Sequence, residues 1–267
     1  MDRHGNTHDV VMGQSDVLKR YRAWTLDEPA REWRALGLLS RHAPGLAPVP
    51  LAAGLGDEPP WLRMSRLDGV SITGPVQDAQ LSAIAAAVLR LHTAVPARTL
   101  HEIPPRAGHP LELLRRVRAW CESFTPPSAG AETDPEAEPD VAAAYNATAA
   151  WAHGRDLERT LAASGTPVLG TGDGNVANYL WDGGEVRLVD FEYAGRSDRA
   201  YELAEVVEHI SAWWHGGTGL DRVVDAADLS GAEARRLVEC RRLLASFWFF
   251  RVVDHTKGAA SRLLKLL

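Results

Sequence analysis

The hydrophobic and polar positions divide the chain into a short β-rich beginning and a longer helical remainder. Two short runs of β-forming residues flank Gly13-Gln14-Ser15 and predict a hairpin. Asp27–His42 begins with acids and a proline and then carries an apolar stripe, which predicts a helix. After a proline-rich connection, residues 61–69 follow Pro59-Pro60 and are typical of a strand that ends in a turn.

The helical remainder shows apolar residues at a spacing of three and four over long windows. The predicted helices are Gln77–Leu91, Leu111–Phe124, one long alanine-rich helix over Val141–Ser164, Arg196–Trp214 and Leu229–Val253. We expect the helix over Arg196–Trp214 to be capped near Ser197-Asp198, and the tail of the chain to form a short amphipathic helix.

The stretch Val168–Gly195 predicts a second hairpin in the middle of this helical part. Its two strands, Tyr179–Trp181 and Val186–Val189, flank the turn sequence Asp182-Gly183-Gly184. An Asp-Gly turn between β-forming runs is a strong local signal for a hairpin.

Polar residues stand at both ends of this hairpin. Asp173 and Asn178 precede the first strand, and Asp190 follows the second. Because a hairpin brings its ends together, we expect the three side chains to meet. Each residue alone is an ordinary turn residue. Their joint spacing favours chemistry instead, since Asn and Asp oxygens suit Mg²⁺ and a nearby carboxylate can orient a hydroxyl for phosphoryl transfer.

The bulk composition is that of an ordinary globular protein, with 267 residues, 45% apolar and 24% charged. A net charge of −6 argues against nucleic acid and favours neutral or cationic ligands. The two cysteines, Cys121 and Cys240, match no metal spacing and are expected to be reduced, in a cytoplasmic protein. We expect no signal peptide and no membrane span. No P-loop, G-x-G-x-x-G or G-x-S-x-G motif is present.

The central stretch also resembles a known family. Gly172-Asp173, Asn178 and Asp190-Phe191-Glu192-Tyr193 are similar to the H-G-D-x-x-x-x-N and D-[FW]-E motifs of the aminoglycoside phosphotransferase and choline kinase family. That family has a protein-kinase-like fold. The departure is Thr171, where the family usually has a histidine that supports the loop. We therefore expect a weakened scaffold rather than an abolished reaction.

The resemblance implies a two-lobed α+β fold. A small N-lobe with an antiparallel sheet would cover residues 1–66, and a larger, mainly helical C-lobe would cover residues 67–267. In the catalytic centre, Asp173 would be the base, and Asn178 and Asp190 would hold Mg²⁺.

The resemblance also implies a nucleotide site between the lobes. Lys19 would pair with the α- and β-phosphates and Glu32 would fix Lys19. A further set of residues would contact the nucleotide's phosphates or adenine edge through loop or backbone groups: Gly5, Asn6, Thr7, Met64, Ser65 and Arg66. Candidate substrate contacts are Glu192, Trp213 and Trp214, although an aromatic pair at helical spacing is more often core.

The expected function is therefore an ATP- or GTP-dependent O-phosphotransferase acting on a small molecule, with Mg²⁺. The substrate would be an aminoglycoside or other antibiotic or natural product, and choline, ethanolamine or another metabolite is the alternative. An alternative of another class is a catalytically silent nucleotide-binding protein. The acidic segment 125–140 is either a solvated linker or a lip that attracts cations. We expect a monomer or homodimer.

Overall fold

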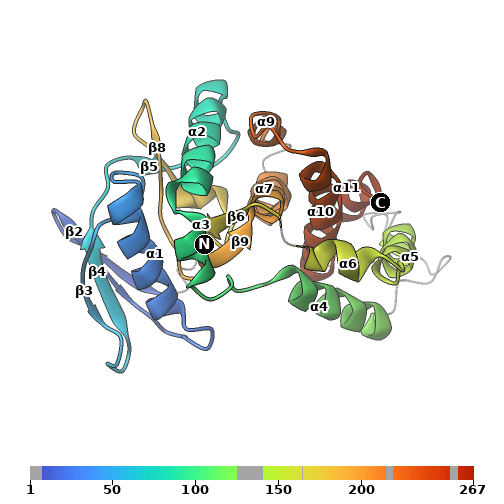
Figure 1. Ribbon diagram of the computed structural model, residues 1–267, viewed down its shortest axis with the longest axis horizontal. Helices are drawn as coiled ribbons and strands as arrows, with labels where there is room; N and C mark the ends of the chain where they lie inside the picture. Colours follow the sequence, from blue (N-terminus) through green and yellow to red (C-terminus); the bar gives the residue numbers. More distant parts are fainter. Residues whose placement is uncertain (1–7, 125–140, 164, 215–218, 253–257) are drawn as a thin grey trace, which may run out of the picture.

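The computed structural model describes residues 8–124, 141–163, 165–214, 219–252 and 258–267 (Figure 1). At the N-terminal end, strands β1 (Asp9–Met12) and β2 (Asp16–Arg20) form the predicted hairpin. Strand β4 (Trp61–Ser65) pairs with the other edge of β2, and β3 (Pro50–Gly54) pairs with β4. The resulting antiparallel sheet has the order β1-β2-β4-β3, and helix α1 (Glu28–His42) lies beside it (Figure 1).

The rest of the described chain is mainly helical, with two small sheets inside it (Figure 1). Its strands pair in the orders β5-β7-β8 and β6-β9. The strands and the short 3-10 turn are β5 (Val70–Ser71), β6 (Pro167–Gly170), η1 (Val176–Asn178), β7 (Tyr179–Trp181), β8 (Val186–Leu188) and β9 (Gly195–Asp198). The helices are α2 (Asp78–Ala94), α3 (Ala97–His101), α4 (Pro110–Ser123), α5 (Val141–Ala152), α6 (Leu157–Ala162), α7 (Arg199–Glu208), α8 (Ile210–Trp214), α9 (Asp221–Asp225), α10 (Gly231–Val252) and α11 (Ala259–Leu264).

Helix α10 is the centre of the helical part, because it packs against α4, α6, α7 and α11. One apolar cluster includes side chains from both parts of the chain, such as Leu36 and Leu62 on one side and Leu91 and Leu243 on the other. A second cluster gathers around Phe249 where α5, α10 and α11 meet. The small-sheet and helical parts confirm the expected α+β fold class, while the lobe boundary at residues 66 and 67 stays a prediction.

The helix predicted over Val141–Ser164 is wrong as a single element, since α5 and α6 are separated at Gly154. The Gly154 N–H donates to the Trp151 carbonyl in a turn. Arg118 Nε, from α4, donates to the Ala152 carbonyl at 2.9 Å. That carbonyl would otherwise accept the next helical bond, so a contact from another helix fixes the end of α5.

The helix predicted over Arg196–Trp214 is also wrong at its start and in its middle. Residues 195–198 form β9 and pair antiparallel with β6, because this long-range pairing satisfies their backbone groups. Asp198 then caps α7, as expected, by accepting from the Tyr201 N–H at 3.1 Å. His209 has extended backbone angles, φ −60° and ψ 141°, and separates α7 from α8.

The central hairpin of β7 and β8 is confirmed, and its strands pair with Tyr179 opposite Leu188 and Trp181 opposite Val186. Asp182 Oδ1 accepts from the N–H groups of Gly184 and Glu185 at 2.9 and 2.8 Å, which closes the turn. Gly183 supplies the positive φ of 103° that this turn requires. Within the described residues, none of the helices combines the length and the apolar character needed to cross a bilayer.

The loop before the hairpin lies directly against α7 at Gly174. A Cβ at Gly174 would lie 2.3 Å from the backbone oxygen of Glu205, a group that cannot turn away. We therefore predict that Gly174→Ala lowers the free energy of unfolding by about 1–3 kcal/mol through overpacking, as measured by denaturant unfolding. The matched control is Gly56→Ala, whose Cβ would meet no described atom within 4 Å. Equal stability of the two variants would contradict the close approach.

Candidate active site

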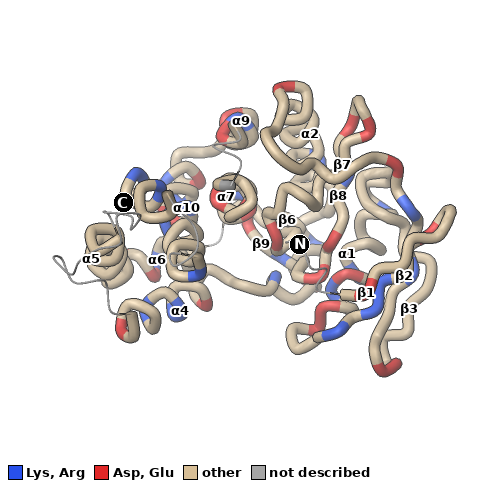
Figure 2. Tube along the Cα trace, turned by 180° about the vertical axis from the view of Figure 1, so that it is seen from behind, with Lys and Arg blue, Asp and Glu red and all other residues tan. Residues whose placement is uncertain are grey.

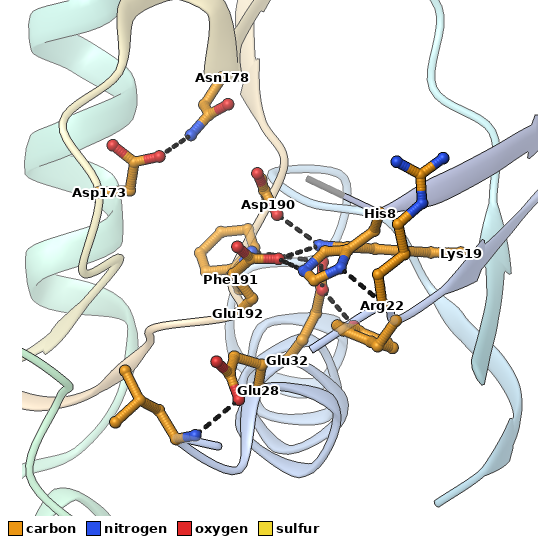
Figure 3. Close-up of polar contacts among 12 residues, drawn as sticks. His8, Lys19, Arg22, Glu28, Glu32, Asp173, Asn178, Asp190, Phe191 and Glu192 are labelled. Atoms are coloured by element: carbon orange, nitrogen blue, oxygen red, sulfur yellow. Dashed lines mark hydrogen bonds and ion pairs between the residues drawn. The ribbon is translucent and has the colours of Figure 1, made fainter. Parts of the chain in front are cut away.

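The carboxylate of Glu32, on the buried face of α1, contacts three residues from two segments of the chain (Figure 3). Its Oε2 accepts from Lys19 Nζ at 2.8 Å and from the Tyr21 hydroxyl at 2.5 Å. Its Oε1 accepts from the Phe191 N–H at 3.3 Å. Lys19 reaches Glu32 because alternate residues of a strand point to opposite faces, and Lys19 lies on the inner face of β2. Glu32 thus joins the sheet to the segment that follows the central hairpin.

Lys19 contacts two further carboxylates besides Glu32. Its Nζ lies 2.5 Å from Asp190 Oδ1 and 2.7 Å from Glu192 Oε2 (Figure 3). Burial alone would lower the pKa of Lys19, but the three carboxylates hold it well above its usual value. Burial and the neighbouring Asp190 raise the pKa of Glu192 to about 7. Burial likewise raises the pKa of Asp190, against the opposing effect of Lys19. One ammonium therefore faces more negative charge than it can neutralise.

His8 completes this cluster on the side of β1. Its Nδ1 accepts from the Arg22 N–H at 3.2 Å, and its Nε2 lies 2.7 Å from Glu192 Oε2. Burial and the nearby Lys19 lower the pKa of His8 to about 4, so the ring is neutral at pH 7. Glu192 is consequently in contact with Lys19 and His8 inside the cluster, and its contact with a substrate stays a prediction.

Asp173 lies in the loop before η1 and is held by three donors. Its Oδ1 accepts from the Asn175 N–H at 3.0 Å and lies 3.1 Å from His209 Nε2. Its Oδ2 accepts from Asn178 Nδ2 at 3.1 Å (Figure 3). Burial would raise the pKa of Asp173, but the three donors outweigh it and lower that pKa below its usual value. The carboxylate is therefore ionised at neutral pH.

The three side chains expected to meet are only partly joined by contacts. Asp173 and Asn178 are hydrogen-bonded, whereas Asp190 is bonded to Lys19. The hairpin does close, since the Val189 N–H donates to the Asn178 carbonyl at 3.0 Å and brings Asp190 next to Asn178. Asp190 has a φ of 67°, in the left-handed region that few non-glycine residues adopt. Such backbone outliers concentrate at functional sites.

The loop that carries Asp173 is supported from below by Arg106, a fully buried residue in the connection after α3. Arg106 Nη1 donates to Glu202 Oε1 at 3.0 Å, and its Nη2 contacts the Gly172 carbonyl at 3.0 Å and Glu205 Oε2 at 3.1 Å. Glu202 in turn accepts from the Thr171 N–H at 3.1 Å. The main chain on both sides of position 171 is thereby fixed without a histidine there.

A cavity of about 330 Å³ opens beside Asp173. Its charged walls hold three acids and three arginines, of which Arg106 pairs with Glu205 and Arg116 pairs with Glu112. The third arginine is Arg251, and the apolar and aromatic lining includes Leu26, Leu113, Tyr193, Leu244, Phe247 and Trp248. Trp213, expected to contact the substrate, instead packs against the two apolar clusters. Trp214 ends α8, and its side chain lies outside the described part.

The remaining residues expected at the nucleotide are placed only in part. Gly5, Asn6, Thr7 and the segment 125–140 lie outside the described residues. Met64 and Ser65 end β4, as expected. The N–H of Ser65 donates to the Val49 carbonyl, and that of Arg66 donates to the Ser15 carbonyl. These two N–H groups are therefore committed within the protein, and an adenine edge would have to meet other backbone groups there.

Asp190 and Asn178 offer oxygens that would suit a divalent cation at the end of the hairpin. Oxygens of Glu32, Asp190 and Glu192 also lie within 4.8 Å of one another, but all three residues contact the Lys19 ammonium. Burial is the main cause that raises the pKa values of Asp190 and Glu192, and the neighbouring acids add to it. Because Asn178 donates to Asp173 through its nitrogen, its amide oxygen is left as an acceptor. Carboxylate and amide oxygens are the ligands that Mg²⁺ prefers.

Sequence reasoning missed Arg106 and the roles of His8 and His209. Arg106 stands in a loop between two prolines and a glycine, where an arginine has no local partner. His209 lies near the end of the predicted helix, directly after Glu208. The partners of Arg106 and His209 lie far along the chain, so the spacing of residues within either segment gave no reason to single them out.

A known protein family and several solved structures are similar to this chain. The family model described as "Phosphotransferase enzyme family" matches residues 5–239. No curated protein sequence matches the chain. Among solved structures, the fold is similar to a choline/ethanolamine kinase family protein from Mesorhizobium loti, with a TM-score of 0.67 and 16% identity over 98% of this chain and 86% of the other.

Two further solved structures show the same fold. One is choline kinase LicA from Streptococcus pneumoniae, with a TM-score of 0.61 and 14% identity over 100% of this chain and 91% of the other. The other is aminoglycoside 2'-phosphotransferase-IIIa in its GDP complex, with a TM-score of 0.63 and 12% identity over 98% of this chain and 88% of the other.

The support under the loop can be tested at Arg106. We predict that Arg106→Met lowers the free energy of unfolding by about 3–5 kcal/mol, because it leaves the buried Glu202 and Glu205 without their cation. Denaturant unfolding measures the loss. The control is Arg22→Met, which removes an exposed pair with Asp9 that solvent screens, and should leave stability nearly unchanged. A similar, small effect of both substitutions would contradict the assigned role of Arg106.

Proposed function

Because this chain belongs to the phosphotransferase enzyme family and is a small-molecule kinase, we propose that it moves the γ-phosphate of ATP to a hydroxyl of an aminoglycoside or other antibiotic or natural product. One observation carries this proposal. Asp173 is an ionised carboxylate at the wall of a cavity, and the Lys19 cluster lies on the other side of the hairpin end. Acceptor and phosphate donor would approach the loop from these two sides.

In the proposed reaction Asp173 orients the acceptor hydroxyl and takes its proton. As the hydroxyl oxygen forms its bond to the γ-phosphorus, the bond from that phosphorus to the bridging oxygen breaks, and the nucleoside diphosphate leaves. Lys19, fixed by Glu32, would pair with the α- and β-phosphates in place of Asp190 and Glu192. Asn178 and Asp190 would hold Mg²⁺, which when bound neutralises charge on the phosphate oxygens.

The nucleotide is proposed to be ATP, with GTP as the alternative. Structures of this fold include aminoglycoside phosphotransferase APH(2'')-Ib with ADP and aminoglycoside 2'-phosphotransferase-IIIa with GDP. The Lys19 ammonium supports either donor, because it is charged at neutral pH and would meet only the phosphates, which the two nucleotides share.

A second candidate substrate is choline, ethanolamine or a similar metabolite. The aromatic rings of Tyr193, Phe247 and Trp248 line the cavity together with the acid Glu205. Aromatic faces beside a carboxylate can hold an onium group through cation–π attraction.

We further propose a cytoplasmic enzyme that works as a monomer or homodimer without a nucleic-acid or membrane partner. Along the described chain, basic and acidic residues are interspersed over both the sheet part and the helical part (Figure 2). Binding to a nucleic acid would instead be supported by one extended basic face.

The proposed activity predicts release of ADP that depends on an acceptor. Purified protein with ATP and Mg²⁺ is presented with a panel of aminoglycosides, macrolides, choline and ethanolamine. We expect ADP formation above background for at least one of them, with equimolar phosphorylated product by mass spectrometry. Nucleotide binding without ADP release across the whole panel would instead identify a catalytically silent nucleotide-binding protein.

The base can be tested at Asp173 itself. We predict that Asp173→Asn lowers kcat by about 10²–10⁴-fold, since it removes the proton acceptor while keeping the shape of the side chain. ATP affinity, measured by calorimetry, should stay close to that of the unaltered protein because Lys19 is untouched. Asp225→Asn, at an exposed position on α9, is the control. Near-normal turnover of Asp173→Asn would rule out this base.

A further inference from the structure

His209 lies between α7 and α8 with its ring against the loop of Asp173. The helix ends before it, and its extended backbone turns the imidazole toward the loop. Its Nε2 lies 3.1 Å from Asp173 Oδ1. The Trp248 ring of α10 packs edge-on against the imidazole, with the two ring centroids 4.7 Å apart. The imidazole is buried and lines the cavity beside Asp173. Its orientation is therefore fixed by contacts on several sides.

The hydrogen bonds of Ser211 determine which ring nitrogen of His209 carries the proton. Ser211 Oγ accepts from the Val176 N–H at 2.9 Å, so its own proton is free to point to His209 Nδ1, 2.8 Å away. The Ser211 N–H also donates to Nδ1, at 3.2 Å. Since Nδ1 accepts these bonds, the ring proton is on Nε2 and points to Asp173. His209 then has no lone pair free to take a proton from a substrate.

The two carboxylate oxygens of Asp173 have different hydrogen-bond partners. Oδ1 accepts from the Asn175 N–H at 3.0 Å and from His209 Nε2. Oδ2 accepts from Asn178 Nδ2 at 3.1 Å. A carboxylate oxygen has two acceptor sites. Among the contacts of the described residues, Oδ1 uses both of its sites and Oδ2 uses one.

We propose that His209 is a positioning residue that occupies Asp173 Oδ1 through its Nε2–H, so that Oδ2 is the oxygen that receives the proton of the acceptor hydroxyl. This inference rests on the proposed phosphotransferase function. It assigns to His209 the orientation of the base, and to Ser211 the choice of tautomer.

The kinetic test compares His209→Gln with His209→Leu. Glutamine keeps an N–H donor at the end of its side chain, and leucine does not. We expect His209→Leu to lower kcat by about 10–100-fold, the effect of losing a hydrogen bond to a charged group, with the KM values for ATP and acceptor nearly unchanged. We expect His209→Gln to recover most of kcat. His92→Leu is the control, because it removes another buried imidazole, on α2.

Two kinetic results would overturn the proposal when thermal unfolding shows folded variants. One is a kcat of His209→Leu within about twofold of the unaltered enzyme, far below the expected effect of such a bond. The other is an equal loss in His209→Gln and His209→Leu, which would show that the donated N–H is not the cause. In either case an active unaltered enzyme leaves the proposed function standing.

A spectroscopic measurement on the unaltered protein tests the proposal even if the variants fail to fold. Nitrogen-15 NMR of the full chain with labelled histidine reports which ring nitrogen of each histidine carries a proton. We expect His209 to be protonated at Nε2 and not at Nδ1. A proton on Nδ1 would overturn the assignment. This readout needs no turnover, so it decides the contact even if the substrate panel shows no activity.

Discussion

The buried carboxylate of Glu32 is the interaction on which the rest of the site depends. It is bonded to Lys19 of β2, to Tyr21 just after that strand, and to the main-chain N–H of Phe191, more than a hundred and fifty residues further along the chain. A buried charge is costly unless it is paired and hydrogen-bonded, so these partners are not interchangeable with water. Because one carboxylate holds both the lysine and the segment of Asp190, the two sides of the proposed nucleotide site are set relative to each other by a single group. Removing either partner would leave the other charge buried and unpaired.

A second buried cluster of charged residues surrounds Arg106, and its charges are also paired and hydrogen-bonded. Arg106 meets two glutamates and the Gly172 carbonyl, and the pKa of Glu202 is lowered, although burial opposes this, chiefly by Arg106. Around Lys19 three carboxylates share one ammonium, and the pKa of Glu192 is raised to about 7 by burial and by Asp190. The Arg106 cluster supports the loop, although burial raises the pKa of its second glutamate, Glu205, against the effect of Arg106. The Lys19 cluster has the larger excess of acids, with three carboxylates around one ammonium, and would gain more from a further cation.

The spacing of residues within a segment was sufficient to predict the elements that form from contacts within that segment. The two hairpins follow from turn residues such as Gly183, and α1 follows from its acids, proline and apolar stripe. The Lys19–Glu32 pair was inferred by resemblance, and the structure shows the contact. What failed depends on distant partners. Helix α5 ends where Arg118 takes its carbonyl, and β9 exists because β6 pairs with it. The Arg106–Glu202 contact joins residues 96 positions apart, and no spacing rule within either segment encodes it.

Thr171 shows how the loop keeps its geometry with a smaller side chain. Its N–H is bonded to Glu202, and its hydroxyl lies 3.2 Å from the Asp173 carbonyl, so the main chain is fixed by groups that any residue at 171 would partly provide. The side chain that a histidine at 171 would add is not what orients the Asp173 carboxylate. An imidazole does reach that carboxylate, but it comes from position 209, beyond the end of α7. Support of the main chain and orientation of the Asp173 carboxylate are thus separate in this chain, the first provided by Arg106 and Glu202 and the second by His209 and Asn178. A site divided in this way tolerates a change at 171 as long as both of the other contacts persist.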